Sequence, residues 1–268
     1  MADALPLSPD IAAYFARHSL PAAASSHFPL LNLPAYDAEQ TLRSCEVYHQ
    51  SDNGHGDDDG VQLGRALALL RPPALTQLYL TRQPALGDPG AAGLAAGLRE
   101  LTALEVLHVA DCGLGDAGGA ALADAAKHLG LSRLVLTRNA RLGDAGAAAL
   151  AALLADPAHY VGLKALYLNG CAVGDGGASA LAAALPTGAR ALARLALQDN
   201  RIGDPGMLAL AAAVDRGGLA QEGEFLYLQN NPCTEAGRAA VARAARGKLR
   251  AHLGWPPPNS GIAPTDYD

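Results

Sequence analysis

Apolar residues recur along this chain in two spacings that follow one another. In the stretch that begins at Leu75, leucines fall at positions 75, 78 and 80, and polar residues alternate with the last two. A period of two predicts a short β-strand with one buried face. Leu86 then precedes a glycine-containing turn, and Leu94 and Leu98 follow it at a helical spacing. The pattern therefore predicts a strand followed by a helix in each unit.

This strand-and-helix unit repeats about seven times. Units begin at 42, 75, 104, 131, 163, 192 and 223, and within each full unit the internal steps are constant. A glycine always comes four residues, and a helix anchor eight residues, after each of six positions: Leu86, Leu114, Leu142, Val173, Ile202 and Cys233. Such periodicity predicts a solenoid in which each repeat contacts only its neighbours.

Two polar positions inside the repeat have a structural interpretation. The motif GDxG occurs five times, first at residues 87–90, and its aspartate is expected to cap its own helix rather than to bind phosphate or metal. A second position lies just past each strand, where side chains are expected to turn inward and bond the backbone of adjacent turns. It holds Gln50, Gln83, Cys112, Asn139, Cys171, Asn200 and Asn231.

The consensus LxxLxLxx(N/C)xLGDxGxxxLAxxL resembles the leucine-rich repeats of ribonuclease inhibitor and its relatives, over residues 42–246. The resemblance implies an α/β fold, a right-handed βα solenoid or horseshoe, with seven parallel strands on the concave face and helices on the convex face. Residues 1–41 are expected to form an N-terminal cap segment, and residues 247–268 a C-terminal cap and proline-rich tail.

The strand residues that point away from the core predict the working surface. The position between the two core residues is held by Glu46, Tyr79, His108, Val135, Tyr167, Ala196 and Tyr227, and the position two residues on by Tyr48, Thr81, Ala110, Thr137, Asn169, Gln198 and Gln229; Arg82, Asp111, Arg138 and Asp199 flank them. Tyrosine favours interfaces, although it also tolerates half-exposed strand positions. The predicted partner-binding residues are Tyr48, Tyr79, His108, Arg138, Tyr167, Gln198 and Tyr227.

Charge and composition narrow the choice of partner. The net charge is −6 and the pI about 5.7, which argues against nucleic acid or an anionic membrane as the main partner. The first twenty residues do not form a secretory signal, and the alanine-rich stretches are too interrupted to span a bilayer. Four widely spaced cysteines are expected to be reduced thiols, so we expect a cytoplasmic protein.

Sequence motifs for catalysis are absent. The chain has no P-loop, dinucleotide fingerprint or GxSxG elbow, so we expect no catalytic residue and no cofactor. One acidic stretch, residues 52–59, lies between His49 and the following helix, with His55 inside it. It either binds a divalent cation or is a solvated insertion with one aspartate capping that helix. The spacing of an EF-hand is missing, which favours the insertion.

These observations predict a non-enzymatic protein–protein interaction module, a scaffold or structural subunit of a larger assembly. Similar repeat proteins serve as inhibitors, adaptors and parts of large complexes, including the ciliary axoneme, so a cilium or cytoskeletal location is one expectation. The alternative is a GTPase-activating protein resembling the Ran GTPase activators. That family has more repeats and an acidic tail, whereas this chain ends in PPPNSGIAPTDYD. A third hypothesis is an actin-associated or immune-receptor fragment, but the sequence has no nucleotide-binding domain or helical partner domain to support it.

Overall fold

The computed structural model describes residues 46–51, 54–156, 162–185, 192–219, 225–246 and 250–252, together with helical positions 9 and 13. Its strands form a parallel sheet whose order follows the sequence, β1 to β8. The strands are β1 (Val47–Ser51), β2 (Gln77–Thr81), β3 (Val106–Ala110), β4 (Arg133–Val135), β5 (Ala165–Tyr167), β6 (Arg194–Ala196), β7 (Phe225–Tyr227) and β8 (Arg250–His252).

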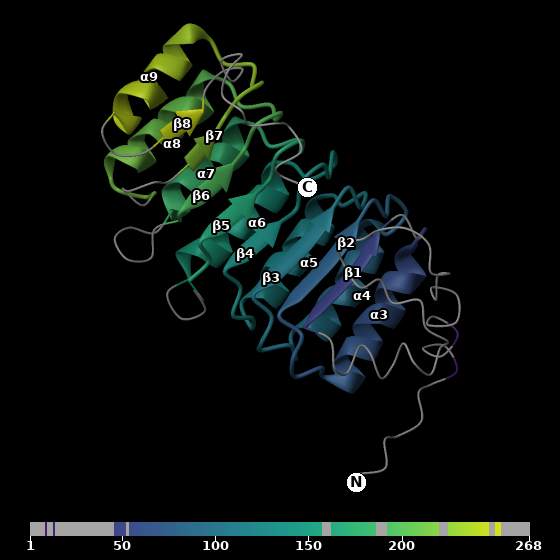
Figure 1. Cartoon of the computed structure of the whole chain (residues 1–268). Coiled ribbons are helices and arrows are strands. Elements are labelled where there is room, and N and C mark those ends of the chain that lie inside the picture. The colour runs from purple at the N-terminus through teal and green to yellow at the C-terminus, as the bar shows by residue number, and fades with distance from the viewer. Residues whose placement is uncertain are drawn as a thin grey trace, which may run out of the picture.

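A helix follows each of the first seven strands and packs against the helices of the neighbouring units. Figure 1 shows the sheet on one side of the stack and the helices on the other. The helices are α3 (Asp57–Leu70), α4 (Gly87–Leu98), α5 (Asp116–Ala126), α6 (Asp144–Ala155), α7 (Asp175–Ala184), α8 (Asp204–Asp215) and α9 (Glu235–Ala245). None of the helices that the structure describes is long and apolar enough to cross a membrane.

The register of the sheet stacks one leucine on the next. Leu78 pairs with Leu107, Leu107 with Leu134, and the series continues through Leu166, Leu195 and Leu226, all fully buried. The predicted α/β repeat solenoid with parallel strands is therefore confirmed. An eighth strand, β8, adds to the seven that were predicted, and it lies in the segment interpreted as the C-terminal cap. The predicted domain boundaries, including the cap over residues 1–41, stay a prediction.

The register predicted for the first strand is wrong by three residues. His49, not Glu46, pairs with Tyr79, and Tyr48 pairs with the core residue Leu78. Because side chains alternate across a strand, an odd shift moves each of them to the opposite face. Tyr48 therefore packs in the core at 3% exposure and is not on the concave surface. This unit lacks the leucines that fix the register elsewhere.

The polar position past the strand behaves as predicted at the three asparagines, whereas Gln50 lies inside β1 and pairs with Leu80, which corrects its assignment to this position. The Oδ1 atom of Asn139 accepts hydrogen bonds from the amides of Cys112 (2.9 Å) and Leu114 (3.1 Å), and its Nδ2 donates to the carbonyls of Val109 (2.8 Å) and Leu136 (3.0 Å). Asn200 and Asn231 bond the preceding layer in the same way. These side chains satisfy backbone groups that the curvature of the chain leaves unpaired.

The aspartates of GDxG do not cap their own helices, which corrects that prediction. Asp88 lies inside the first turn of α4, and its Oδ1 accepts from the amides of Gly115 (2.7 Å) and Gly118 (2.9 Å) at the start of the next helix. A Cβ on Gly118 would lie 2.6 Å from that oxygen, so a side chain there would displace the aspartate. Asp116 and Asp175 repeat both bonds one unit further along. Each aspartate thus joins two repeats.

Candidate functional site

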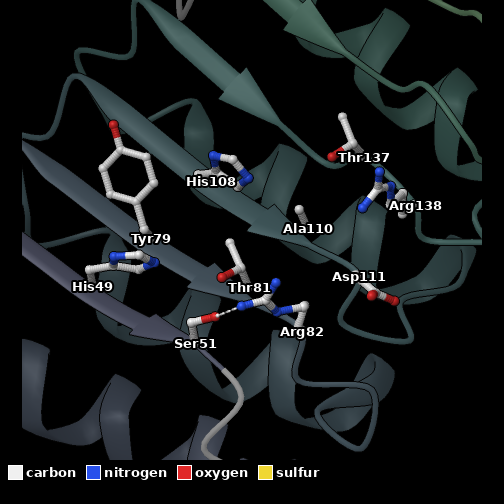
Figure 2. A pocket seen from close by; sticks show the side chains of 10 residues that line it. All are labelled: His49, Ser51, Tyr79, Thr81, Arg82, His108, Ala110, Asp111, Thr137 and Arg138. Carbon is white, nitrogen blue, oxygen red and sulfur yellow. Dashed lines mark hydrogen bonds between the residues drawn. The ribbon is translucent and has the colours of Figure 1, made fainter. Parts of the chain in front are cut away.

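A hollow of about 230 Å³ opens on the strand face over β1 to β4 (Figure 2). Parallel strands bring their outward side chains into rows, so four consecutive repeats contribute to the hollow. Its lining consists of His49, Ser51, Tyr79, Thr81, Arg82, His108, Ala110, Asp111, Thr137 and Arg138. The lining combines aromatic rings, hydroxyl groups and charged side chains.

Three rings form the floor along one row of the sheet. The centroids of His49 and Tyr79 are 5.6 Å apart, and those of Tyr79 and His108 are 5.3 Å apart. The hydroxyl of Tyr79 donates to Oε1 of Gln77 at 2.9 Å. Burial, and then the nearby positive charge of Arg82, lowers the pKa of His49 below its ordinary 6.5. This lowering of the pKa favours the neutral form of His49.

The rim of the hollow is set by an unusual backbone conformation. Arg82, Asp111 and Arg138 follow β2, β3 and β4 with φ of 53°, 54° and 58°, in the left-handed region. Each amide still donates to a carbonyl of the next unit, for example Arg82 N to Ala110 O at 3.0 Å. The turn sends the backbone toward the helices and leaves the side chains at the edge of the hollow (Figure 2). An Nη2 of Arg82 also donates to Oγ of Ser51 at 3.1 Å.

The later strands carry a different surface. Tyr167 and Tyr227 are 9% and 7% exposed, and they form an apolar cluster with Val135, Ala165, Ala196 and Phe225. The rings of Phe225 and Tyr227 stack at 5.6 Å, and the guanidinium of Arg194 lies 5.7 Å from the Phe225 centroid. We call this set the aromatic cluster. Tyr167 and Tyr227 are therefore mostly buried, which corrects the expectation of exposed rings, while their assignment as partner-binding residues stays a prediction.

The structure brings together three of the seven predicted partner-binding residues. Tyr79, His108 and Arg138 line the hollow. Gln198 lies beyond β6 on the same face, and its Oε1 is buried without a hydrogen-bond partner among the described residues. His49 and Ser51 were missed because of the register error in β1. The sequence could have identified His49 and Ser51 as outward-facing residues, because they lie on the opposite face of the strand from Tyr48, whose ring is buried.

The cysteine thiols of the ladder are poorly suited to nucleophilic chemistry. Burial raises the pKa of both Cys112 and Cys171 from 9.0 to about 12, so they are protonated at neutral pH. Sγ of Cys112 donates to the carbonyl of Ala110 at 3.2 Å. The ladder cysteines therefore act as small inward donors.

Part of the acidic stretch forms the N-terminal end of helix α3. Residues 57–59 form the first turn of α3, and Oδ2 of Asp59 accepts from the amide of Gly56 at 3.0 Å. This contact supports the capping alternative for Asp59, whereas Asp52 and Asn53 lie outside the described residues. In the part of the chain that the structure describes, no three His, Cys, Asp or Glu side chains are grouped to hold a metal ion.

The comparisons with known proteins agree with the repeat. Four segments match a family model described as Leucine Rich repeat: residues 100–123, 131–151, 163–182 and 189–211. These segments fall in units three to six. No curated protein matches the chain.

Proposed function

We propose that this leucine-rich-repeat solenoid is a non-enzymatic module that holds a protein partner on its concave strand face. The observation that carries the proposal is the hollow over β1 to β4. At about 230 Å³ it is smaller than the roughly 300–1,000 Å³ typical of small-molecule sites, and it is built from the side chains of an open sheet. A hollow of this size accommodates a few side chains of a partner.

The lining supplies the contacts that protein interfaces use. The partly exposed rings of Tyr79 and His49 offer flat apolar area with polar edges, and Thr81 and Ser51 offer hydroxyl groups, whereas His108 is only 8% exposed. Arg82 and Arg138 are exposed at the rim, where arginine recognises carboxylates with paired N–H donors. The proposed partner segment therefore carries acidic side chains.

At the level of the cell, we place the protein in the cytoplasm as a scaffold or structural subunit of a multi-protein complex. The resemblance to the ribonuclease-inhibitor type supports this role, and it makes the ciliary axoneme one candidate assembly. The alternative function, a GTPase activator resembling the Ran GTPase activators, can be assayed directly. If the protein accelerates GTP hydrolysis by a Ran-type GTPase, the scaffold proposal is wrong.

The proposal is tested by comparing three proteins as baits in native extract. The first is the unmodified chain, the second carries Tyr79→Ala and Arg138→Glu, and the third carries Arg65→Glu, an exposed position on α3. A true partner is captured by the first and third baits and lost from the second. Its dissociation constant should rise at least about tenfold in the second, because one anchor side chain contributes about 1–2 kcal/mol. Equal capture by all three baits would place the interface elsewhere.

A further inference from the structure

The strand face has two chemically different halves that follow one another along the stack. The half over β1 to β4 is the polar hollow with Arg82 and Arg138 on its rim. The half over β4 to β7 is the aromatic cluster, which ends at Phe225 and Tyr227 on β7. An extended segment that crosses the whole sheet would therefore need apolar residues at one end and acidic residues at the other.

The segment that follows β8 has these two chemistries in the required order. Residues 253–268 read LGWPPPNSGIAPTDYD, with Trp255 and three prolines first, and Asp266 and Asp268 last. Because β8 pairs with β7, the chain leaves the sheet beside Phe225 and Tyr227. Its apolar part is thus closest to the aromatic cluster, and its acidic part comes later in the sequence.

The length of this segment is sufficient to reach the hollow. From β8 to β3 there are five strand spacings, or about 24 Å at about 4.8 Å each. The 14 residues from His252 to Asp266 can extend to about 46 Å, so they cross with slack. In an extended segment Asp266 and Asp268 point to the same side about 7 Å apart, while the rim positions of Arg82 and Arg138, two strands apart, are separated by about 10 Å. Flexible arginine side chains close that difference.

We infer that residues 253–268 dock on the strand face of their own chain, with the acidic end at the rim arginines and Trp255 beside Phe225, the partly exposed member of the aromatic cluster. The inference rests on the proposed function, because it makes this segment a competitor that an acidic partner segment displaces from the hollow. Asp111 lies on the rim between the two arginines, so the two carboxylates straddle it rather than occupy the centre. Docking in cis would limit access to the hollow.

Trp255 is the only tryptophan of the chain, so its fluorescence reports on this segment in the full-length protein. We expect emission shifted to the blue and weak quenching by acrylamide. Two changes should each raise quenching toward that of a free tryptophan: Asp266→Lys with Asp268→Lys, and Arg82→Glu with Arg138→Glu. Losing two exposed ion pairs should lower the docking equilibrium about tenfold. High salt should act in the same direction.

Two comparisons separate direct docking from a general effect of charge. Arg65→Glu with Arg243→Glu makes the same change of charge at exposed positions on α3 and α9, and should leave quenching unchanged. Combining the two charge reversals, in the segment and at the rim, should restore the protection of Trp255. If Trp255 is quenched like free tryptophan in the unmodified chain, or if the combined variant is no better protected than either reversal alone, the inference is overturned. The proposed function is judged separately, by capture of the partner.

Discussion

Asparagine past the end of a strand serves two layers of the solenoid at once. Asn139 is fully buried and uses both ends of its amide, accepting from two backbone amides and donating to two carbonyls. Its place was predictable because the same position recurs in the units whose leucines fix the register. The position of Tyr48 was not predictable, because the first unit is degenerate and offers no second pattern that checks the register of its strand. The role of a single residue is therefore predictable where its position recurs in several units of the chain.

Removing this amide should destabilise the array without changing the strand face. We expect Asn139→Ala, and Asn200→Ala separately, to lower the free energy of unfolding by about 1–3 kcal/mol, because buried backbone groups lose their partners. Chemical denaturation monitored by circular dichroism measures the change. Asn230→Gly is the matched control, since Asn230 is exposed with φ of 57°, which glycine adopts readily. Unfolding midpoints equal to the control in both alanine variants would contradict the assignment.

Successive helices are tied together at their N-terminal ends. An aspartate in the first turn of one helix accepts hydrogen bonds from the free amides that begin the next one, as Asp116 does for Gly143 (2.7 Å) and Gly146 (2.8 Å). The sequence alone suggested a cap within one helix, because spacing along the chain cannot distinguish a carboxylate that turns back from one that reaches across. The second glycine of GDxG leaves room for this crossing carboxylate in four of the motifs, because a Cβ would lie 2.6 to 3.0 Å from an aspartate oxygen; these glycines are Gly118, Gly146, Gly177 and Gly206.

The bond between repeats predicts a specific effect of one carboxylate. Asp116→Ala should lower the free energy of unfolding by about 1–2 kcal/mol, the usual effect of removing a helix cap. Asp58→Ala also removes an acid from the first turn of a helix, α3, but Asp58 is exposed and accepts no such bond from the next unit in the described structure. Thermal unfolding should therefore separate the two variants. A larger effect of Asp58→Ala would show that the helix dipole, and not the bond between repeats, is what the aspartates provide.

The whole molecule is a stack in which neighbours pack on neighbours. Among the described elements, extensive contacts join strands to adjacent strands and helices to adjacent helices, and α9 also contacts β8. Such an architecture is predictable from sequence because each repeat has the same pattern of apolar and polar positions. The site is less predictable, since it depends on which side chains the strands bring together. Tyr79 and Tyr167 occupy equivalent positions, yet one lines the hollow and the other is packed under its neighbours.

A defect in the centre of one repeat should therefore weaken the stack locally. Leu107 on β3 is fully buried, so Leu107→Ala opens a cavity and should lower the free energy of unfolding by about 2–5 kcal/mol. Hydrogen exchange measured by mass spectrometry should accelerate most in β2 to α5 and little in α8 and α9, because stability in a repeat array is transmitted from neighbour to neighbour. Leu69→Ala, at a leucine that is 43% exposed, should change neither measurement appreciably. Equal acceleration from β2 to α9 would mean that the array opens as a single cooperative unit.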